Sequence, residues 1–169
     1  MVASPADVER VTELLGRAPR ADFEVVVRSA SGEPAVIRNA PLLADGTPMP
    51  TRYWLVAPDL VRAVSRLEAD GGVRAAEATV DPEALAAAHA AYAADRNAAV
   101  PDRWTGPRPF GGVGGTRHGV KCLHAHYAWH LAGGSDPVGV WVAARLDTPA
   151  SERRRERARS VDAEATHEP

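Results

Sequence analysis

Lys121 and Cys122 are the only lysine and the only cysteine of the chain, and they are neighbours. They lie within residues 116–131, TRHGVKCLHAHYAWHL, which also hold four of the six histidines. A glycine-rich run, residues 111–115, leads into this stretch. Ammonium, thiol and imidazole groups are side chains that bind anions, attack electrophiles or ligate metal ions. The sequence therefore places the chemistry of the protein here.

The first interpretation is an anion site at the entry to a helix. The glycines would offer backbone N–H groups, Arg117 and Lys121 would supply charge, and the helix N-terminus would add partial positive charge. The spacing is not that of a nucleotide-binding P-loop, because Val120 comes between Gly119 and Lys121 and no apolar strand precedes the loop. The alternative is a glycine-rich connector with two surface cations. The ligand-binding residues that we expect are Gly114, Gly115, Arg117, His118, Lys121 and His124.

The second interpretation is a metal site, with zinc as the ion. Cys122 and His126 are four residues apart, as are His126 and His130, so each pair lies on one side of a helix. A single helix seldom completes a tetrahedral shell, and no second cluster with ligand spacing is visible. The alternative is that these histidines fill half-buried positions. We predict no cofactor, and zinc remains the alternative through these three residues.

The third interpretation makes Cys122 a catalytic nucleophile. A cysteine in the first turn of a helix, beside Lys121, would have a lowered pKa. It would need a histidine base and a third orienting group from elsewhere, and His89 is a candidate for the base. His89 shares one side of a helix with Tyr92 and Arg96, for which the alternative is core packing with a charged edge. His124 does not qualify on a regular helix, where two residues two positions apart point about 200° apart. The alternative is a lone cysteine acting as a small buried apolar residue.

The elements that must position this stretch follow from periodicity and turn signals. Strands are expected at residues 23–28, 35–38 and 52–56, and they form a small antiparallel sheet of about three strands. Five helices are expected: from Pro5, with Ser4 as its N-cap, to Gly16; from Pro58 to Gly71 and Gly72; from Asp81 to about Asn97; from Gly119 or Val120 to about Leu131; and from Asp136 to Leu146. The fold class is α+β, with about five helices packed on the sheet. Residues 1–146 form one domain, and residues 147–169 form a charged, disordered, flexible tail.

Composition limits the function classes. A formal net charge of −2 predicts no general attraction to nucleic acid or to an acidic membrane. No apolar run reaches the roughly 20 residues of a membrane span. One cysteine excludes an internal disulfide, which suits a reducing compartment. We expect a cytoplasmic protein whose partner is a small anionic ligand, with a protein partner as the second expectation.

Three blocks of the sequence resemble a known family. They are residues 39–55 (NAPLLADGTPMPTRYWL), 65–73 (SRLEADGGV) and 115–131 followed by DPVG at 136–139. They are similar to the bacterial, mainly actinobacterial, domain of unknown function 501 family over about residues 14–146. Many relatives carry a cysteine-rich start to the first hairpin, where this chain has RSASGEP at 28–34. That difference disfavours a metal site shared with Cys122.

The resemblance implies a cytoplasmic protein of unassigned activity, and it supplies no catalytic residues. Family genes tend to lie near those of a septum-formation initiator and an exopolyphosphatase, which implies a link to cell division or phosphate metabolism. Our leading hypothesis is a binding or accessory protein for a small anionic, phosphorylated ligand. The alternatives are an enzyme or metal-binding protein centred on Cys122, and an interaction module of the division machinery with an exposed apolar surface around Tyr53, Trp54 and Trp104.

Overall fold

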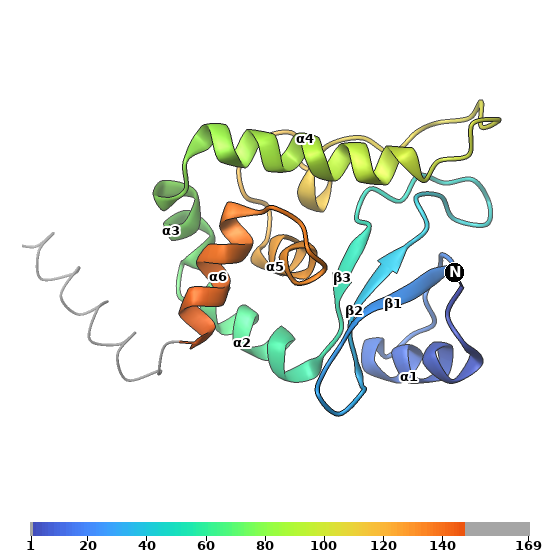
Figure 1. Ribbon diagram of the computed structural model, residues 1–169, viewed down its shortest axis with the longest axis horizontal. Coiled ribbons are helices and arrows are strands. Elements are labelled where there is room, and N and C mark those ends of the chain that lie inside the picture. Colours follow the sequence, from blue (N-terminus) through green and yellow to red (C-terminus); the bar gives the residue numbers. More distant parts are fainter. Residues whose placement is uncertain (1, 148–169) are drawn as a thin grey trace, which may run out of the picture.

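A three-stranded antiparallel sheet lies at one end of the molecule (Figure 1). The computed structural model describes residues 2–147. Its strands are β1 (Phe23–Arg28), β2 (Pro34–Asn39) and β3 (Tyr53–Leu55), in the order β1-β2-β3. Because β2 is the central strand, its apolar side chains are buried, whereas those of the edge strand β1 are mostly half-buried. The predicted sheet is confirmed.

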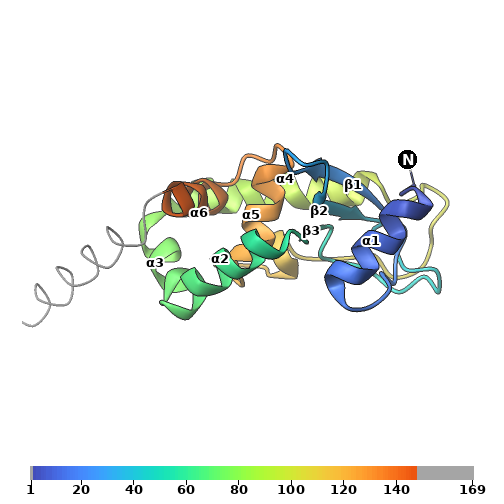
Figure 2. The same cartoon turned by 90° about the horizontal axis from the view of Figure 1, so that it is seen from below.

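Helix α1 (Pro5–Leu15) covers one face of this sheet. The Ser4 side chain accepts a hydrogen bond from the Asp7 N–H at 3.2 Å, and Gly16 ends the helix in the left-handed region. Both are the cap residues that the sequence predicts. Val11 is fully buried against the sheet, in a small core that is separate from the main one. Figure 2 shows α1 beside the strands, away from the other helices.

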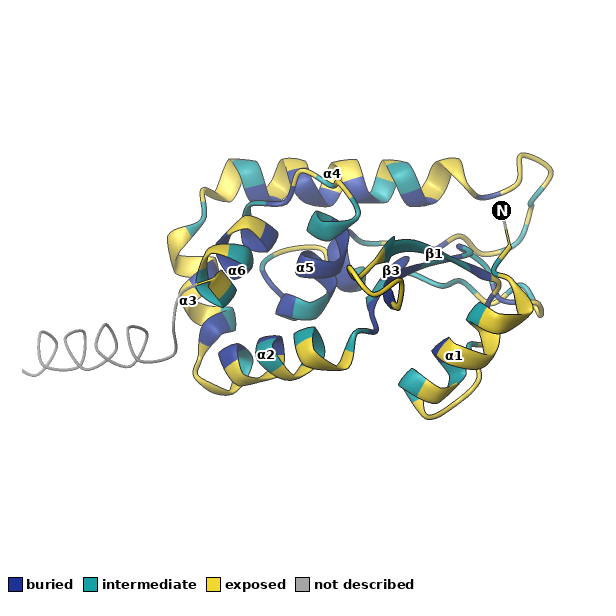
Figure 3. Cartoon of the chain, turned by 60° about the horizontal axis from the view of Figure 1, so that its bottom comes forward, coloured by how far each residue is buried: buried dark blue, intermediate teal, exposed yellow. Residues whose placement is uncertain are grey.

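The remaining helices form the other end of the molecule and surround α5 (Figure 1). They are α2 (Pro58–Ala69), α3 (Gly72–Thr79), α4 (Pro82–Ala98), the short 3-10 turn η1 (Val113–Gly115), α5 (Leu123–Leu131) and α6 (Pro137–Asp147). The central helix α5 contacts α2, α6, η1 and β3, so most of its residues are buried. The main core gathers around it, with buried sides of the helices facing inward (Figure 3).

The structure differs from the sequence-based expectation in two elements. Helix α3 was not predicted, because we took Gly71 and Gly72 as the end of α2; the chain turns at Gly71 and starts a new helix at Gly72. The expected start of α5 at Gly119 or Val120 is wrong. Gly119 has φ +64° and Cys122 has extended backbone angles, so the helix begins at Leu123.

Two further expectations concern the whole chain. Within residues 2–147 no helix has the length and apolar character needed to cross a membrane. The last helix, expected to Leu146, ends at Asp147. The flexible tail predicted for residues 147–169 lies outside the described residues except for Asp147.

Candidate functional site

Helix α4 holds the glycine-rich loop, residues 109–119, through two buried side chains. One is Arg96, only 1% exposed, whose guanidinium donates hydrogen bonds to the carbonyls of Phe110 at 3.2 Å and Gly111 at 2.8 Å. It also reaches the carbonyls of Pro109 and Pro50. Burial lowers the pKa of Arg96, because its charge has left water. Backbone dipoles thus replace the water around this cation.

The second anchor is His89. Its Nδ1 accepts a hydrogen bond from the Val113 N–H at 3.1 Å, so Nε2 carries the proton and donates to the Gly119 carbonyl at 3.0 Å. Gly112 packs directly on the imidazole, where a Cβ would collide with the ring. Burial lowers the pKa of His89, which favours this neutral form. We had noted His89, Tyr92 and Arg96 as one side of a helix, and the structure shows that this side fixes the loop.

Three backbone N–H groups of the loop donate to carbonyls of the loop itself. Gly112 N–H donates to the Thr116 carbonyl at 2.7 Å, Gly115 N–H to the Gly112 carbonyl at 3.0 Å, and Thr116 N–H to the Val113 carbonyl at 3.4 Å. The carbonyl of Gly114 accepts from Lys121 Nζ at 3.2 Å. The loop is therefore a closed turn, and its glycines serve tight turns and close packing. It offers fewer free N–H groups than we expected from Gly114 and Gly115.

Three cationic or imidazole side chains lie on the outside of this loop. Arg117, His118 and Lys121 are exposed, and residues 109–121 contain no acid. The Arg117 guanidinium lies 5.6 Å from the ring centre of Phe110, which is itself 62% exposed. Among the described residues, none of these three side chains has an ion pair. The carboxylate of Glu77, on α3, lies beside Gly119.

The N-terminus of α5 is occupied by a carboxylate of the protein itself. Glu68, on α2, accepts a hydrogen bond from the Leu123 N–H at 2.6 Å. The same oxygen lies 3.1 Å from His124 Nδ1. A carboxylate is favourable at this position because the helix dipole and the free N–H groups attract negative charge. Glu68 thus takes the place where the sequence led us to expect an external anion.

His124 is held by α2 rather than turned toward the loop. Its Nε2 lies 3.2 Å from both the Ser65 hydroxyl and the Val61 carbonyl, and its Nδ1 faces Glu68. These three α2 residues follow helical spacing, so they present one stripe to α5. The structure therefore separates His124 from the other residues of the predicted anion site.

Cys122 and His124 line one small pocket of about 160 Å³, together with residues of β3. We had expected helical geometry to separate the two, but Cys122 precedes the helix and is extended. Burial raises the pKa of the Cys122 thiol, and the nearby Glu68 charge raises it further, outweighing Lys121 and the α5 N–H groups. The prediction that the pKa of Cys122 is lowered is therefore wrong.

The three candidate metal ligands are not brought together. His126 is fully buried, and its Nδ1 donates to Asp136 at 2.7 Å. Asp136 also accepts the N–H groups of Val138 and Gly139, so it caps α6. His130 stacks on Tyr127 instead, with ring centres 6.3 Å apart. Residues 2–147 hold no group of three side chains arranged for a metal ion, and Cys122, His126 and His130 are no exception.

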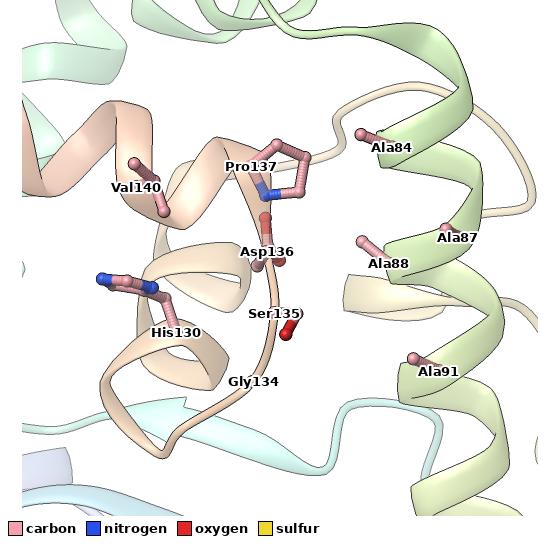
Figure 4. Close-up of a pocket in the computed structure, with 10 residues that line it drawn as sticks. All are labelled: Ala84, Ala87, Ala88, Ala91, His130, Gly134, Ser135, Asp136, Pro137 and Val140. Atoms are coloured by element: carbon pink, nitrogen blue, oxygen red, sulfur yellow. The ribbon is translucent and has the colours of Figure 1, made fainter.

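A larger groove lies elsewhere, between α4 and the connector that leads into α6 (Figure 4). Its volume is about 650 Å³, and its lining is mostly apolar. Of the candidate ligand, metal and catalytic residues predicted from the sequence, only His130 lines this groove. Sequence reasoning missed this groove, although the run of alanines in α4 marked one of its walls.

The comparisons with known proteins give a family. The model of the family described as "Protein of unknown function (DUF501)" matches residues 25–144. The chain belongs to this family. The match includes the glycine-rich loop, α5 and the anchoring face of α4. No curated protein and no solved structure matches the chain.

Proposed function

We propose that this member of the DUF501 family is a binding or accessory protein for a small anionic, phosphorylated ligand. The ligand is held by Arg117 and Lys121 on the outer side of the glycine-rich loop, with His118 beside them. The observation that carries the proposal is the combination of these exposed cations, without an ion pair in residues 2–147, and a loop fixed by buried side chains. A rigid loop loses little entropy when it orders a ligand.

The hydrogen-bond donors in this proposal differ from those that the sequence led us to expect at the helix N-terminus. Because Glu68 fills the N-terminus of α5, the helix end contributes nothing to an external anion. The attraction comes from the side chains instead. At the surface such contacts are screened by salt, so binding should weaken as ionic strength rises. A link to phosphate metabolism or cell division stays part of the proposal, through the phosphoryl group of the ligand.

The test is a titration of the full chain with inorganic phosphate, pyrophosphate and citrate. Calorimetry measures the affinity, and the NMR shifts of the loop amides locate the site. We expect pyrophosphate to bind and Arg117→Ala combined with Lys121→Ala to abolish binding. The matched control is Arg74→Ala, which removes an exposed arginine from α3. The proposal fails if none of the three anions binds, or if the double variant binds as the wild type does.

A second candidate function is thiol-dependent chemistry in the pocket of Cys122. The observation in its favour is that Cys122 and His124 share that pocket, with His124 oriented by Glu68. These are the residue types of nucleophile, base and orienting acid in cysteine enzymes, but both ring nitrogens of His124 face α2. The raised pKa of Cys122 opposes it, because the thiolate is the reactive form. The rate at which Cys122 is alkylated at neutral pH tests this second function, because an activated thiol reacts faster than free cysteine.

The third expectation, an interaction surface around three aromatic residues, has little support. Tyr53 is only 5% exposed. Trp54 lies under the Arg17 guanidinium, and the Trp104 indole N–H donates to the Pro107 carbonyl at 2.9 Å. These side chains are packed against their own chain and do not form the exposed apolar patch that docking would need.

A further inference from the structure

The groove beside α4 has a mostly apolar lining. One wall consists of the side chains of Ala84, Ala87, Ala88 and Ala91, which follow helical spacing. The other wall includes His130 and Val140, across the connector of residues 134–137 (Figure 4). Val140 is 55% exposed, one of the few large apolar side chains so exposed in the described residues. A partner seated here would bury Val140.

The outward face of α4 carries only alanine. From Ala84 to Ala94 every residue that is exposed or half-buried is alanine, and the larger residues Leu85, His89 and Tyr92 are buried. Figure 3 shows the exposed positions of α4 on its outer side. Helix α2 differs, since Asp59, Arg62 and Arg66 lie on its exposed side. Helices with a solvated face normally carry polar residues there, and a helix that is apolar all round is usually covered. Alanine also lets two helix axes approach to about 8 Å.

The ends of α4 have opposite charge. Asp81 and Glu83 lie at its start, and Glu83 has no ion pair within residues 2–147. The segment after its end carries Arg103 and Arg108 against one acid, Asp102. Two copies of α4 that run antiparallel would place the acidic start of each beside the basic end of the other. Their helix dipoles would also be opposed, which is favourable.

The geometry points to a symmetric homodimer in which α4 and its groove pack on the same surface of a second copy. A two-fold axis across the alanine face would bring Glu83 of each copy beside Arg103 of the other. Two-fold dimers are also the commonest oligomers. The alanines supply close approach, Val140 supplies the large apolar side chain, and the paired ends fix the antiparallel direction. The interface does not involve the glycine-rich loop, so it is independent of anion binding.

The experiment is sedimentation velocity of the full chain from about 1 to 100 µM, a range that detects dissociation constants near micromolar. We expect a mass of twice 17.9 kDa at the upper concentrations. Ala87→Arg should leave the monomer at every concentration, because the two-fold axis brings in two like charges. The matched control Ala78→Arg, at an exposed alanine of α3, should leave the dimer intact.

A charge exchange tests the direction of packing. Glu83→Arg and Arg103→Glu should each weaken the dimer, and the two together should restore it. The melting temperature of each variant shows that the monomer remains folded. A wild type that stays monomeric throughout the range, or a dimer unaffected by Ala87→Arg, overturns the interface. A dimer that Ala87→Arg breaks, but that the double charge exchange does not restore, overturns the antiparallel arrangement.

Discussion

The glycine-rich loop and the start of α5 are adjacent in the sequence, but they meet negative charge in opposite ways. The loop keeps its cations on the outside, and its backbone is held from within by Arg96 and His89. The start of α5 receives the carboxylate of Glu68, which satisfies its first N–H group. One segment stays available to an anion from solution, and the other is already neutralised. Charge and a helix end next to each other in sequence need not form one site.

The largest expected effect concerns the anchor of the loop. Arg96→Met removes the buried guanidinium and leaves the carbonyls of Phe110 and Gly111 without their donor. We expect the free energy of unfolding to fall by about 3 kcal/mol or more, since each buried unsatisfied group costs roughly 1–3 kcal/mol. Urea denaturation measures it. Arg66→Met, at an exposed arginine of α2, is the control and should change stability by less than about 0.5 kcal/mol. An equal effect in both variants would show that Arg96 does not anchor the loop.

The second prediction concerns His89 and pH. Burial lowers the pKa of His89 in the folded state, so the unfolded chain takes up the proton first as the pH falls. Its contribution to stability is present above the unfolded pKa of about 6.5 and is lost below it. Protonation of Nδ1 also breaks the bond from Val113 N–H. We expect the stability of the wild type to fall more than that of His89→Ala between about pH 7.5 and 5.5.

The same urea series measures how much His89 contributes to the free energy of unfolding. At the higher pH, His89→Ala should lower the free energy of unfolding by about 2 kcal/mol, because a buried N–H group loses its acceptor. Parallel pH curves for the two proteins would mean that His89 does not titrate differently on folding.

The third prediction removes the carboxylate that closes α5. Glu68→Ala should destabilise the protein by about 1 kcal/mol, the usual worth of a capping group. It should also open the helix end to anions, so that phosphate raises the melting temperature more in the variant than in the wild type. Glu68→Gln, which keeps an acceptor for the Leu123 N–H, separates charge from hydrogen bonding. If phosphate acts equally on all three proteins, Glu68 does not occupy an anion position.

The smallest expected effect is on the reactivity of Cys122. Because burial and Glu68 raise its pKa, iodoacetamide at neutral pH should alkylate it more slowly than free cysteine. Glu68→Gln should increase the rate by a few-fold, since one of the two causes is removed. Mass spectrometry of timed samples measures the modified fraction. A thiol that reacts faster than free cysteine would instead favour the enzyme hypothesis.

Short-range patterns predicted much of the fold. The caps Ser4 and Gly16, the three strands and the start of α4 at Asp81 follow from residues within a few positions of each other. The start of α5 did not follow, because the left-handed turn at Gly119 and the extended Cys122 interrupt an apolar stripe that continues across them. Helix α3 was missed for the related reason that two glycines can either end a helix or join two of them.

The candidate site could be located from the sequence but not assembled from it. The stretch around Lys121 and Cys122 was marked by its unusual residue types. Glu68 lies 55 positions before the N–H that it accepts, and Arg96 lies 15 positions before Gly111. Neither spacing has a periodic signature, since such contacts depend on how whole helices pack. From the sequence we interpreted Arg96 as part of the charged edge of a helix, because charged residues are usually exposed.

By itself, the sequence determined the type of fold, the positions of most helices and strands, and the segment that carries the cations. These depend on hydrophobic periodicity and capping, which act over one or two turns of chain. Only the tertiary structure decided which groups remain free. It placed Glu68 on α5, anchored the loop through buried Arg96 and His89, raised the pKa of Cys122 and left an alanine face on α4 without a partner from residues 2–147. Burial and charge pairing are properties of neighbours in space, and packing alone brings those neighbours together.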